Sequence, residues 1–214
     1  MARKKLIRTN QFPYHVWNRS RNKDWYQIPT TTIWEYSKEI FKKIERTTPI
    51  NLHAFVLMQN HYHMLITTPE NNIDKIMYYF NKNLGLKIRS TSNRQNQIFG
   101  GRYKWSIINN RKYLSHVFKY VLQNPVNANI VDKCEDYEFS TWSYQCSQKN
   151  FSIPILPITE EIDKTISDDM LTWINNPYNK IQTKSLSTGL KNGYFSPSNK
   201  EQISLEFEKP FFRR

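Results

Sequence analysis

Two histidines, His61 and His63, stand two residues apart in the stretch HYHMLITT, which has the composition of a β-strand. Successive side chains of a strand point to opposite faces, so the two imidazoles share a face and lie about 7 Å apart along the backbone. Their ring nitrogens could bind one divalent metal ion. Because two histidines on a polar sheet face are more often structural, this spacing alone is a weak prediction of a metal site.

A second set of residues strengthens that interpretation. In RKYLSHVFKYVLQNPVNANIV, His116, Tyr120 and Asn124 follow one another at intervals of four, which aligns them on one face of a helix. An amide oxygen can complete the coordination of a metal, and a phenol nearby can attack a phosphate that the metal holds. The alternative is a Tyr120 packed on the sheet and an Asn124 bonded to backbone. Pro125 predicts that the helix kinks or ends beside Asn124.

Positive charge is concentrated in the first part of the chain. The 214 residues carry a formal net charge of +13. Residues 1–131 hold 21 basic and 6 acidic side chains, whereas residues 132–214 hold 10 basic and 12 acidic ones. No carboxylate occurs between Asp74 and Asp132. A field of one sign over half of a protein favours a polyanionic partner such as a nucleic acid over a merely soluble basic surface.

The elements that must position these residues alternate between strands and helices. Strands are expected over 13–19, 50–59, 61–68 and 102–108, and helices over 30–46, 72–88 and 111–131. A tight turn at Gln59 and Asn60 joins the second and third strands. The order strand–helix–strand–strand–helix–strand predicts an α+β fold with a ferredoxin-like (split βαβ) antiparallel sheet flanked by helices. The helix 111–131 is then an addition to that sheet.

The chain divides into a domain over residues 1–131 and a C-terminal extension over residues 132–214. A short helix or turn is expected in STWSYQCSQ, followed by a linker around Pro154 and Pro157. An acidic amphipathic helix is expected over 159–174, and a polar tail follows it. Two cysteines, Cys134 and Cys146, are too few for a disulfide framework, and they predict reduced thiols in a cytoplasmic protein.

At this point the motifs amount to a family resemblance. HYH followed by MLI resembles the HUH motif (histidine, bulky hydrophobic residue, histidine) of single-tyrosine endonucleases. Together with YHVWNR before it and KYVLQNPVNANIV after it, it resembles the REP-associated tyrosine transposases, relatives of the smallest insertion-sequence transposases. The resemblance covers roughly residues 12–145 and includes EFSTWSYQ.

The resemblance implies a metal-dependent enzyme that cuts and rejoins DNA strands. His61 and His63 match the metal-binding histidines, Tyr120 the nucleophile and Asn124 a third ligand, with Mg²⁺ or Mn²⁺ as the ion. Tyr120 would attack a phosphate of single-stranded DNA beside a hairpin (a REP-like palindrome), giving a 5′-phosphotyrosine and a free 3′-OH. A second 3′-OH could reverse the step and join strands without ATP.

Several residues extend or depart from this pattern. The expected contacts with the DNA backbone are Arg19, Arg102, Lys104, Arg111 and Lys112. The prediction rests on their grouping, since each one alone could be an ordinary surface charge. His116 is either a group just behind the metal ligands or a plain helix-face histidine. Tyr62 replaces the usual aliphatic residue between the histidines and should point to the opposite face. Asn127 and Asn129 replace a common arginine and glycine, and Asn129 can adopt the left-handed conformation of that glycine.

Two other functions share some of these features. The main alternative is a domesticated, non-catalytic protein that binds hairpin DNA or RNA, and a second is a metal-dependent hydrolase that uses water and does not need Tyr120. The extension favours a monomer, although a homodimer that exchanges the tyrosine helix remains open. No segment approaches the roughly 18 apolar residues of a membrane span, so no membrane partner is expected.

Overall fold

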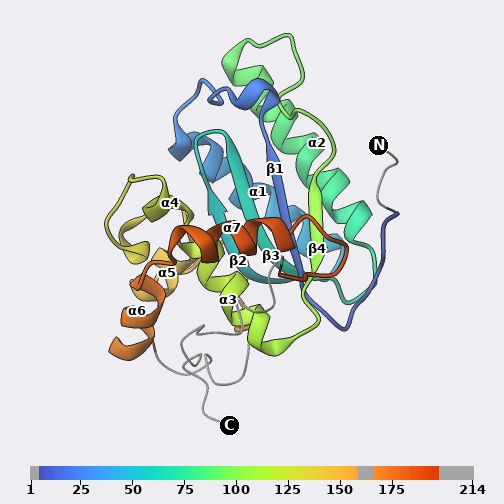
Figure 1. Ribbon diagram of the computed structural model, residues 1–214. Helices are drawn as coiled ribbons and strands as arrows, with labels where there is room; N and C mark the ends of the chain where they lie inside the picture. The colour runs from blue at the N-terminus through green and yellow to red at the C-terminus, as the bar shows by residue number, and fades with distance from the viewer. Residues whose placement is uncertain (1–4, 159–165, 198–214) are drawn as a thin grey trace.

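The computed structural model describes residues 5–158 and 166–197. Its centre is a four-stranded antiparallel sheet in the order β2-β3-β1-β4 (Figure 1). The strands are β1 (Tyr14–Arg19), β2 (Asn51–Leu57), β3 (His61–Thr67) and β4 (Lys104–Ile107). This strand order, with one helix after β1 and another after β3, confirms the predicted α+β, ferredoxin-like arrangement.

The pairing of β1 with β3 places the two motif strands side by side at the centre of the sheet. Arg19 lies opposite His61 and Trp17 lies opposite His63. The β2–β3 hairpin closes through a hydrogen bond of 2.8 Å from the Met58 backbone N–H to the His61 carbonyl, which leaves Gln59 and Asn60 as the predicted two-residue turn.

Two long helices cover one face of the sheet, which we call the α1/α2 face. They are α1 (Thr30–Thr47) and α2 (Ile73–Ser92), and each turns an apolar stripe towards the strands. Tyr62, Met64 and Ile66 of β3 are fully buried in this core with Phe41 and Phe80 from the helices. Tyr62 therefore points away from the histidines, as alternation along the strand predicts.

The opposite face, which we call the α3 face, is covered by α3 (Arg111–Leu122) and by parts of the C-terminal extension. The extension contributes α5 (Thr141–Cys146), α6 (Asp168–Asn175) and α7 (Lys180–Gly189), and α7 crosses in front of the sheet in Figure 1. Val56 and Leu65 of the sheet share a buried cluster with Phe118, Trp142 and Ile174.

Backbone hydrogen bonds from the extension cover both edges of the sheet. At the β2 edge, the Leu156 N–H donates to the Leu52 carbonyl at 2.8 Å. At the β4 edge, the Ile107 N–H donates to the Gly193 carbonyl and the Phe195 N–H to the Ile107 carbonyl, both at 2.8 Å. These contacts occupy backbone groups at part of each edge that another strand could otherwise pair with.

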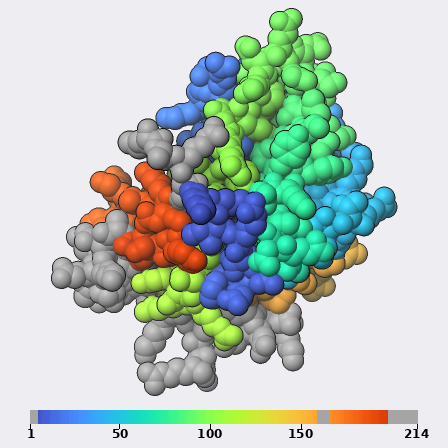
Figure 2. Space-filling view, turned by 90° about the vertical axis from the view of Figure 1, so that its right-hand side faces the viewer, coloured from blue at the N-terminus to red at the C-terminus, as the bar shows by residue number. Residues whose placement is uncertain are grey.

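The N-terminal segment is also held to the body of the molecule. Figure 2 shows this segment, in dark blue, between the start of α2 in teal and the C-terminal segment in red. The Arg8 guanidinium donates two hydrogen bonds to the Asp74 carboxylate, at 2.8 and 3.1 Å. None of the helices within the described ranges has the length and apolar content needed to cross a bilayer.

Some predicted boundaries were wrong. The expected helix 111–131 ends at Leu122 as α3, and a separate short helix, α4 (Asn124–Asn127), follows; the break beside Asn124 is the one that Pro125 predicted. Asn129 has a φ of 53° and so adopts the expected left-handed conformation. α2 continues to Ser92, past the predicted end at residue 88.

Only the later part of the expected acidic helix over 159–174 falls in the described residues. α6 begins at Asp168, where the Ser167 side chain accepts a hydrogen bond from the Met170 N–H and caps it. Residues 159–165, where the predicted helix was to begin, lie outside the described residues.

Candidate active site

His61 and His63 lie together on the α3 face, with ring centroids 5.2 Å apart and planes at 83°. His63 is 6% exposed and His61 is partly exposed. The His61 Nδ1 lies 2.6 Å from the Asn60 amide oxygen, which can only accept a hydrogen bond. Nδ1 of His61 therefore carries the hydrogen, and its Nε2 keeps the lone pair that a metal needs.

A third histidine, His15 on β1, completes this cluster, and the motif analysis missed it. Its Nε2 lies 2.9 Å from the Nδ1 of His63, and the two rings stack with centroids 5.2 Å apart. It is 1% exposed. The sequence signal was its place in YHVWNR, two residues before Trp17 and four before Arg19, because all three share one face of β1.

Helix α3 brings Tyr120 to the same cluster. The Tyr120 ring centroid lies 6.1 Å from that of His63 and 6.4 Å from that of His15, in both cases edge to face. Within the described part of the chain its hydroxyl forms no hydrogen bond. Burial raises the pKa of the Tyr120 phenol, and the nearby positive charge of Arg19 opposes that rise.

The histidines are held in their neutral form. Burial lowers the pKa of His15 to about 3, and burial with the charge of Arg19 lowers the pKa of His61 to about 4. Burial, the neighbouring histidines and Arg19 together lower the pKa of His63 well below its ordinary value. All three imidazoles are thus unprotonated at neutral pH, which is the form that can bind a metal.

Asn124 stands at the start of α4, directly after the break in the helix. Its side-chain N–H₂ donates to the carbonyls of Tyr120, at 2.9 Å, and Val121, at 3.2 Å. This is the backbone bonding that the sequence left open as an alternative. It fixes the amide and, among the described residues, leaves its Oδ1 without a donor, so that oxygen remains available as a ligand.

His116 contacts the C-terminal extension, as a plain helix-face histidine can, and a role behind the metal ligands stays a prediction. Its Nδ1 lies 2.8 Å from the Tyr178 hydroxyl, and its ring packs near Trp173 with centroids 6.2 Å apart. Each interval of four residues rotates a helix position by about 40°, so a row at this spacing drifts around the axis. Lys119 belongs to the same packing, with its Nζ 4.8 Å from the Trp173 ring and 4.6 Å from the Tyr178 ring.

The donor set suits a hard or borderline divalent ion. Two imidazole nitrogens and one amide oxygen are acceptable ligands for Mn²⁺, and Mg²⁺ accepts them with additional oxygen ligands. No group of three or more histidine, cysteine, aspartate or glutamate residues in the described part of the chain is arranged to hold a metal. Asn124, the third ligand that the sequence predicts, is a residue type outside those four.

A basic hollow opens beside the histidines. It has a volume of about 470 Å³, and Arg19, Lys23, Arg102 and Lys104 line it. None of the described residues that line it is acidic. Three of the five predicted DNA contacts thus meet in one place. Arg111 and Lys112 are exposed at the start of α3 and do not line this hollow.

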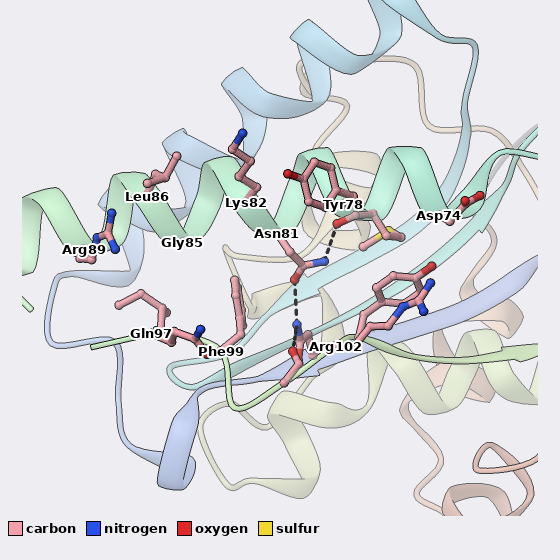
Figure 3. A pocket seen from close by; sticks show the side chains of 15 residues that line it. Asp74, Tyr78, Asn81, Lys82, Gly85, Leu86, Arg89, Gln97, Phe99 and Arg102 are labelled. Atoms are coloured by element: carbon pink, nitrogen blue, oxygen red, sulfur yellow. Dashed lines mark hydrogen bonds between the residues drawn. The ribbon is translucent and has the colours of Figure 1, made fainter. Parts of the chain in front are cut away.

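A larger groove of about 540 Å³ adjoins the hollow, sharing Arg102 with it (Figure 3). Lys82 and Arg89 of α2 lie along one side, and Phe99 lies across from them. Asp74 is the acidic member of the lining, and its carboxylate is paired with Arg8. The groove therefore combines apolar and aromatic surface with a positively charged rim.

Comparisons with known proteins agree with this geometry. Residues 9–147 match the model of a protein family described as "Transposase IS200 like". The chain belongs to the IS200-like transposase family. The matched range contains the three-histidine cluster, Tyr120 and Asn124, and it ends before α6 and α7.

Among IS200-like transposases, the chain is similar to the REP-associated tyrosine transposase of Escherichia coli (strain K12), with 28% identity over 118 residues. This match covers 52% of the chain and 66% of the relative, slightly under two thirds of its length. A solved structure, described as a REP-associated tyrosine transposase bound to a REP hairpin, has a TM-score of 0.57 at 17% identity. The match covers 78% of this chain and all of that one, and it shows a shared fold.

Proposed function

We propose that this protein cleaves and rejoins single-stranded DNA at hairpin-flanked sites through a 5′-phosphotyrosine on Tyr120. The observation that carries the proposal is the contact of the Tyr120 ring with His63, one of a pair of neutral histidines on the same sheet face. Membership of the IS200-like family supports this proposal, and so does the hairpin named in the description of the similar solved structure.

The residues that would hold Mg²⁺ or Mn²⁺ are His61 and His63 through Nε2 and Asn124 through Oδ1. When bound, such an ion neutralises charge that develops on the scissile phosphate. The chain contributes the orientation: Asn60 fixes the ring of His61, His15 contacts that of His63, and the end of α3 fixes the amide of Asn124.

The Tyr120 phenol is the nucleophile of the proposed step. Burial keeps the Tyr120 hydroxyl protonated at rest, and the charge of Arg19 favours the phenolate that attacks. An Oη–P bond forms as the bond from phosphorus to the 3′-oxygen breaks. The phenol loses one proton and the leaving 3′-oxygen gains one, so the step is balanced. Attack by a 3′-OH on the phosphotyrosine reverses it and joins strands.

The DNA would approach through the basic hollow. Arg19 and Lys104 stand on the face that carries the histidines, so they would hold phosphates next to the reacting one. The groove along α2 offers Phe99 and the exposed Tyr78 as stacking surfaces for unpaired bases. The substrate would therefore be single-stranded DNA flanking a REP-like hairpin.

We further propose that the protein acts as a monomer, because the extension forms backbone hydrogen bonds with both edge strands of the sheet. Light scattering on a size-exclusion column should give the mass of one chain, 25.8 kDa. A mass of two chains at micromolar concentration would contradict this.

A covalent-adduct assay tests the function. Purified protein is incubated with Mg²⁺ or Mn²⁺ and labelled strands that carry hairpins from the flanks of its own gene, then separated on a denaturing gel. A metal-dependent adduct is expected with the wild type and with Tyr62→Phe, and none with Tyr120→Phe or with a chelator. Binding without any adduct would favour the non-catalytic alternative, and cleavage without an adduct would favour a water nucleophile.

A further inference from the structure

The hydrogen bond between His15 and His63 assigns His15 a role that the proposed chemistry does not include. We propose that His15 is a positioning residue: its Nε2 accepts the hydrogen of His63 Nδ1 and so keeps His63 Nε2 free for the metal. This inference rests on the proposed function, since it concerns how one of the metal ligands is prepared.

The distance allows only two arrangements of one hydrogen. The two nitrogens are 2.9 Å apart, so one hydrogen lies between them. A neutral imidazole carries its hydrogen on one nitrogen only. If His63 Nδ1 donates, His63 Nε2 holds a lone pair and can bind a metal. If His15 Nε2 donates instead, His63 Nε2 carries the hydrogen and cannot bind one.

The metal-binding arrangement places a hydrogen on His15 Nδ1, and the neighbouring strand β4 carries a serine hydroxyl on the same face. Ser106 of β4 lies opposite His15 in the strand register, so the two side chains share a face. The Ser106 Oγ and the His15 Nδ1 are both buried, and neither has a hydrogen-bond partner among the described residues. A serine hydroxyl can rotate and accept. In this structure the two atoms are not hydrogen-bonded to each other, so Ser106 would have to rotate before it could receive the hydrogen of His15.

His15 also contacts the Tyr120 ring, so a test must distinguish the packing of the His15 ring from its hydrogen bond to His63. Its ring meets that of Tyr120 with centroids 6.4 Å apart. His15→Phe keeps a flat ring of similar size and removes the acceptor. His15→Gln places an amide oxygen near the position of Nε2 and restores an acceptor. The two variants therefore differ in the hydrogen bond to His63.

The first readout is independent of activity. Manganese binding is followed by the electron paramagnetic resonance signal of free Mn²⁺, and the tautomer of His63 by ¹⁵N NMR of labelled protein. We expect His15→Phe to weaken Mn²⁺ binding about 10- to 100-fold, with His63 no longer held in one tautomer. His15→Gln should stay within a few-fold of the wild type. Equal Mn²⁺ affinity and an unchanged His63 tautomer in His15→Phe would overturn the proposal.

A second measurement needs only the wild type. A hydrogen bond between two ring nitrogens produces a ¹⁵N–¹⁵N coupling, and one is expected between His63 Nδ1 and His15 Nε2 with the hydrogen on His63. No coupling, or a hydrogen on His15 in the presence of diamagnetic Mg²⁺, would refute the inference even if His15→Phe does not fold. A wild type that binds no Mn²⁺ would count against the proposed metal chemistry, and the tautomer in the metal-free protein would still decide the role of His15.

Discussion

The α1/α2 face and the α3 face of the sheet are built from the same strands, yet they bury different kinds of side chain. β3 gives Tyr62, Met64 and Ile66 to the first face and His61 and His63 to the second. On the first face the Tyr62 hydroxyl donates to Asn81 at 2.8 Å within a dense aromatic core. On the second face the imidazoles are buried, and burial lowers their pKa and so disfavours the charged form.

The difference separates a face that holds the fold from a face whose side chains would serve the proposed chemistry. The α1/α2 face joins helices and strands by apolar contact, which is the main source of stability in a domain of this size. The α3 face keeps neutral imidazole nitrogens close to the phenol of Tyr120, an arrangement that packing alone does not require. The predictions below test whether the two faces can be perturbed separately.

Acid should destabilise the protein mainly through the α3 face. Burial, with smaller effects from Lys119 and Lys112, lowers the pKa of His116 to about 3, and burial gives His15 a similar value. Between these values and the ordinary 6.5, the unfolded chain binds protons that the folded chain does not. Stability therefore falls as the pH drops below about 6.5, by about 1.4 kcal/mol per pH unit for each such proton.

Urea unfolding between pH 7 and 4.5, with a chelator present, measures this slope. His116→Gln removes one titrating group. The slope of unfolding free energy against pH should therefore fall by the contribution of about one proton, about 1.4 kcal/mol per pH unit. An unfolding midpoint that does not change over this range, or an unchanged slope in the variant, would contradict the prediction.

Manganese should stabilise the wild type through the same face. At a concentration one hundred times the dissociation constant, binding to the folded state adds about 2.7 kcal/mol. For a chain of this length that raises Tm by roughly 5–10 °C. His61→Ala should abolish the shift, whereas His53→Ala, which removes a histidine on the neighbouring strand, should keep it. Equal shifts in both variants would show that the metal binds elsewhere.

The two phenols should separate stability from chemistry. Tyr62→Phe removes a buried hydrogen bond and should lower the free energy of unfolding by about 1 kcal/mol. Tyr120→Phe removes a hydroxyl without a partner among the described residues and should change it by less than about 0.5 kcal/mol. Urea melts of the two variants measure this. A larger loss of stability in Tyr120→Phe than in Tyr62→Phe would mean that the Tyr120 hydroxyl has a structural role.

Local periodicity explains what the sequence could predict. Alternation along β3 gave the shared face of His61 and His63 and the opposite direction of Tyr62, and the two-residue turn followed from Gln59 and Asn60. Those features depend on neighbours within a few residues. The sheet order followed from the sequence of elements alone.

Long-range register explains what the sequence could not. His15 meets His63 only because β1 pairs with β3 in one register, and no local pattern states that register. The contact of His116 with Tyr178 was not predicted, because its partner lies 62 residues away in the extension. The edge contacts of Leu156 and Gly193 come from irregular segments, which carry no periodic signal.

The smallest expected effect is on the salt dependence of DNA binding. It tests whether bound DNA is confined to the α3 face or also reaches the α1/α2 face. A lysine or arginine that contacts a phosphate adds about one unit to the slope of log K against log salt concentration. Lys104→Ala, in the hollow beside the histidines, should lower that slope by about one. Arg89→Ala, in the groove along α2, should do so only for strands with unpaired flanks long enough to reach it. Lys42→Ala, exposed on α1, is the matched control and should leave the slope unchanged. If Arg89→Ala behaves like Lys42→Ala with every strand, binding is confined to the α3 face and the groove takes no DNA.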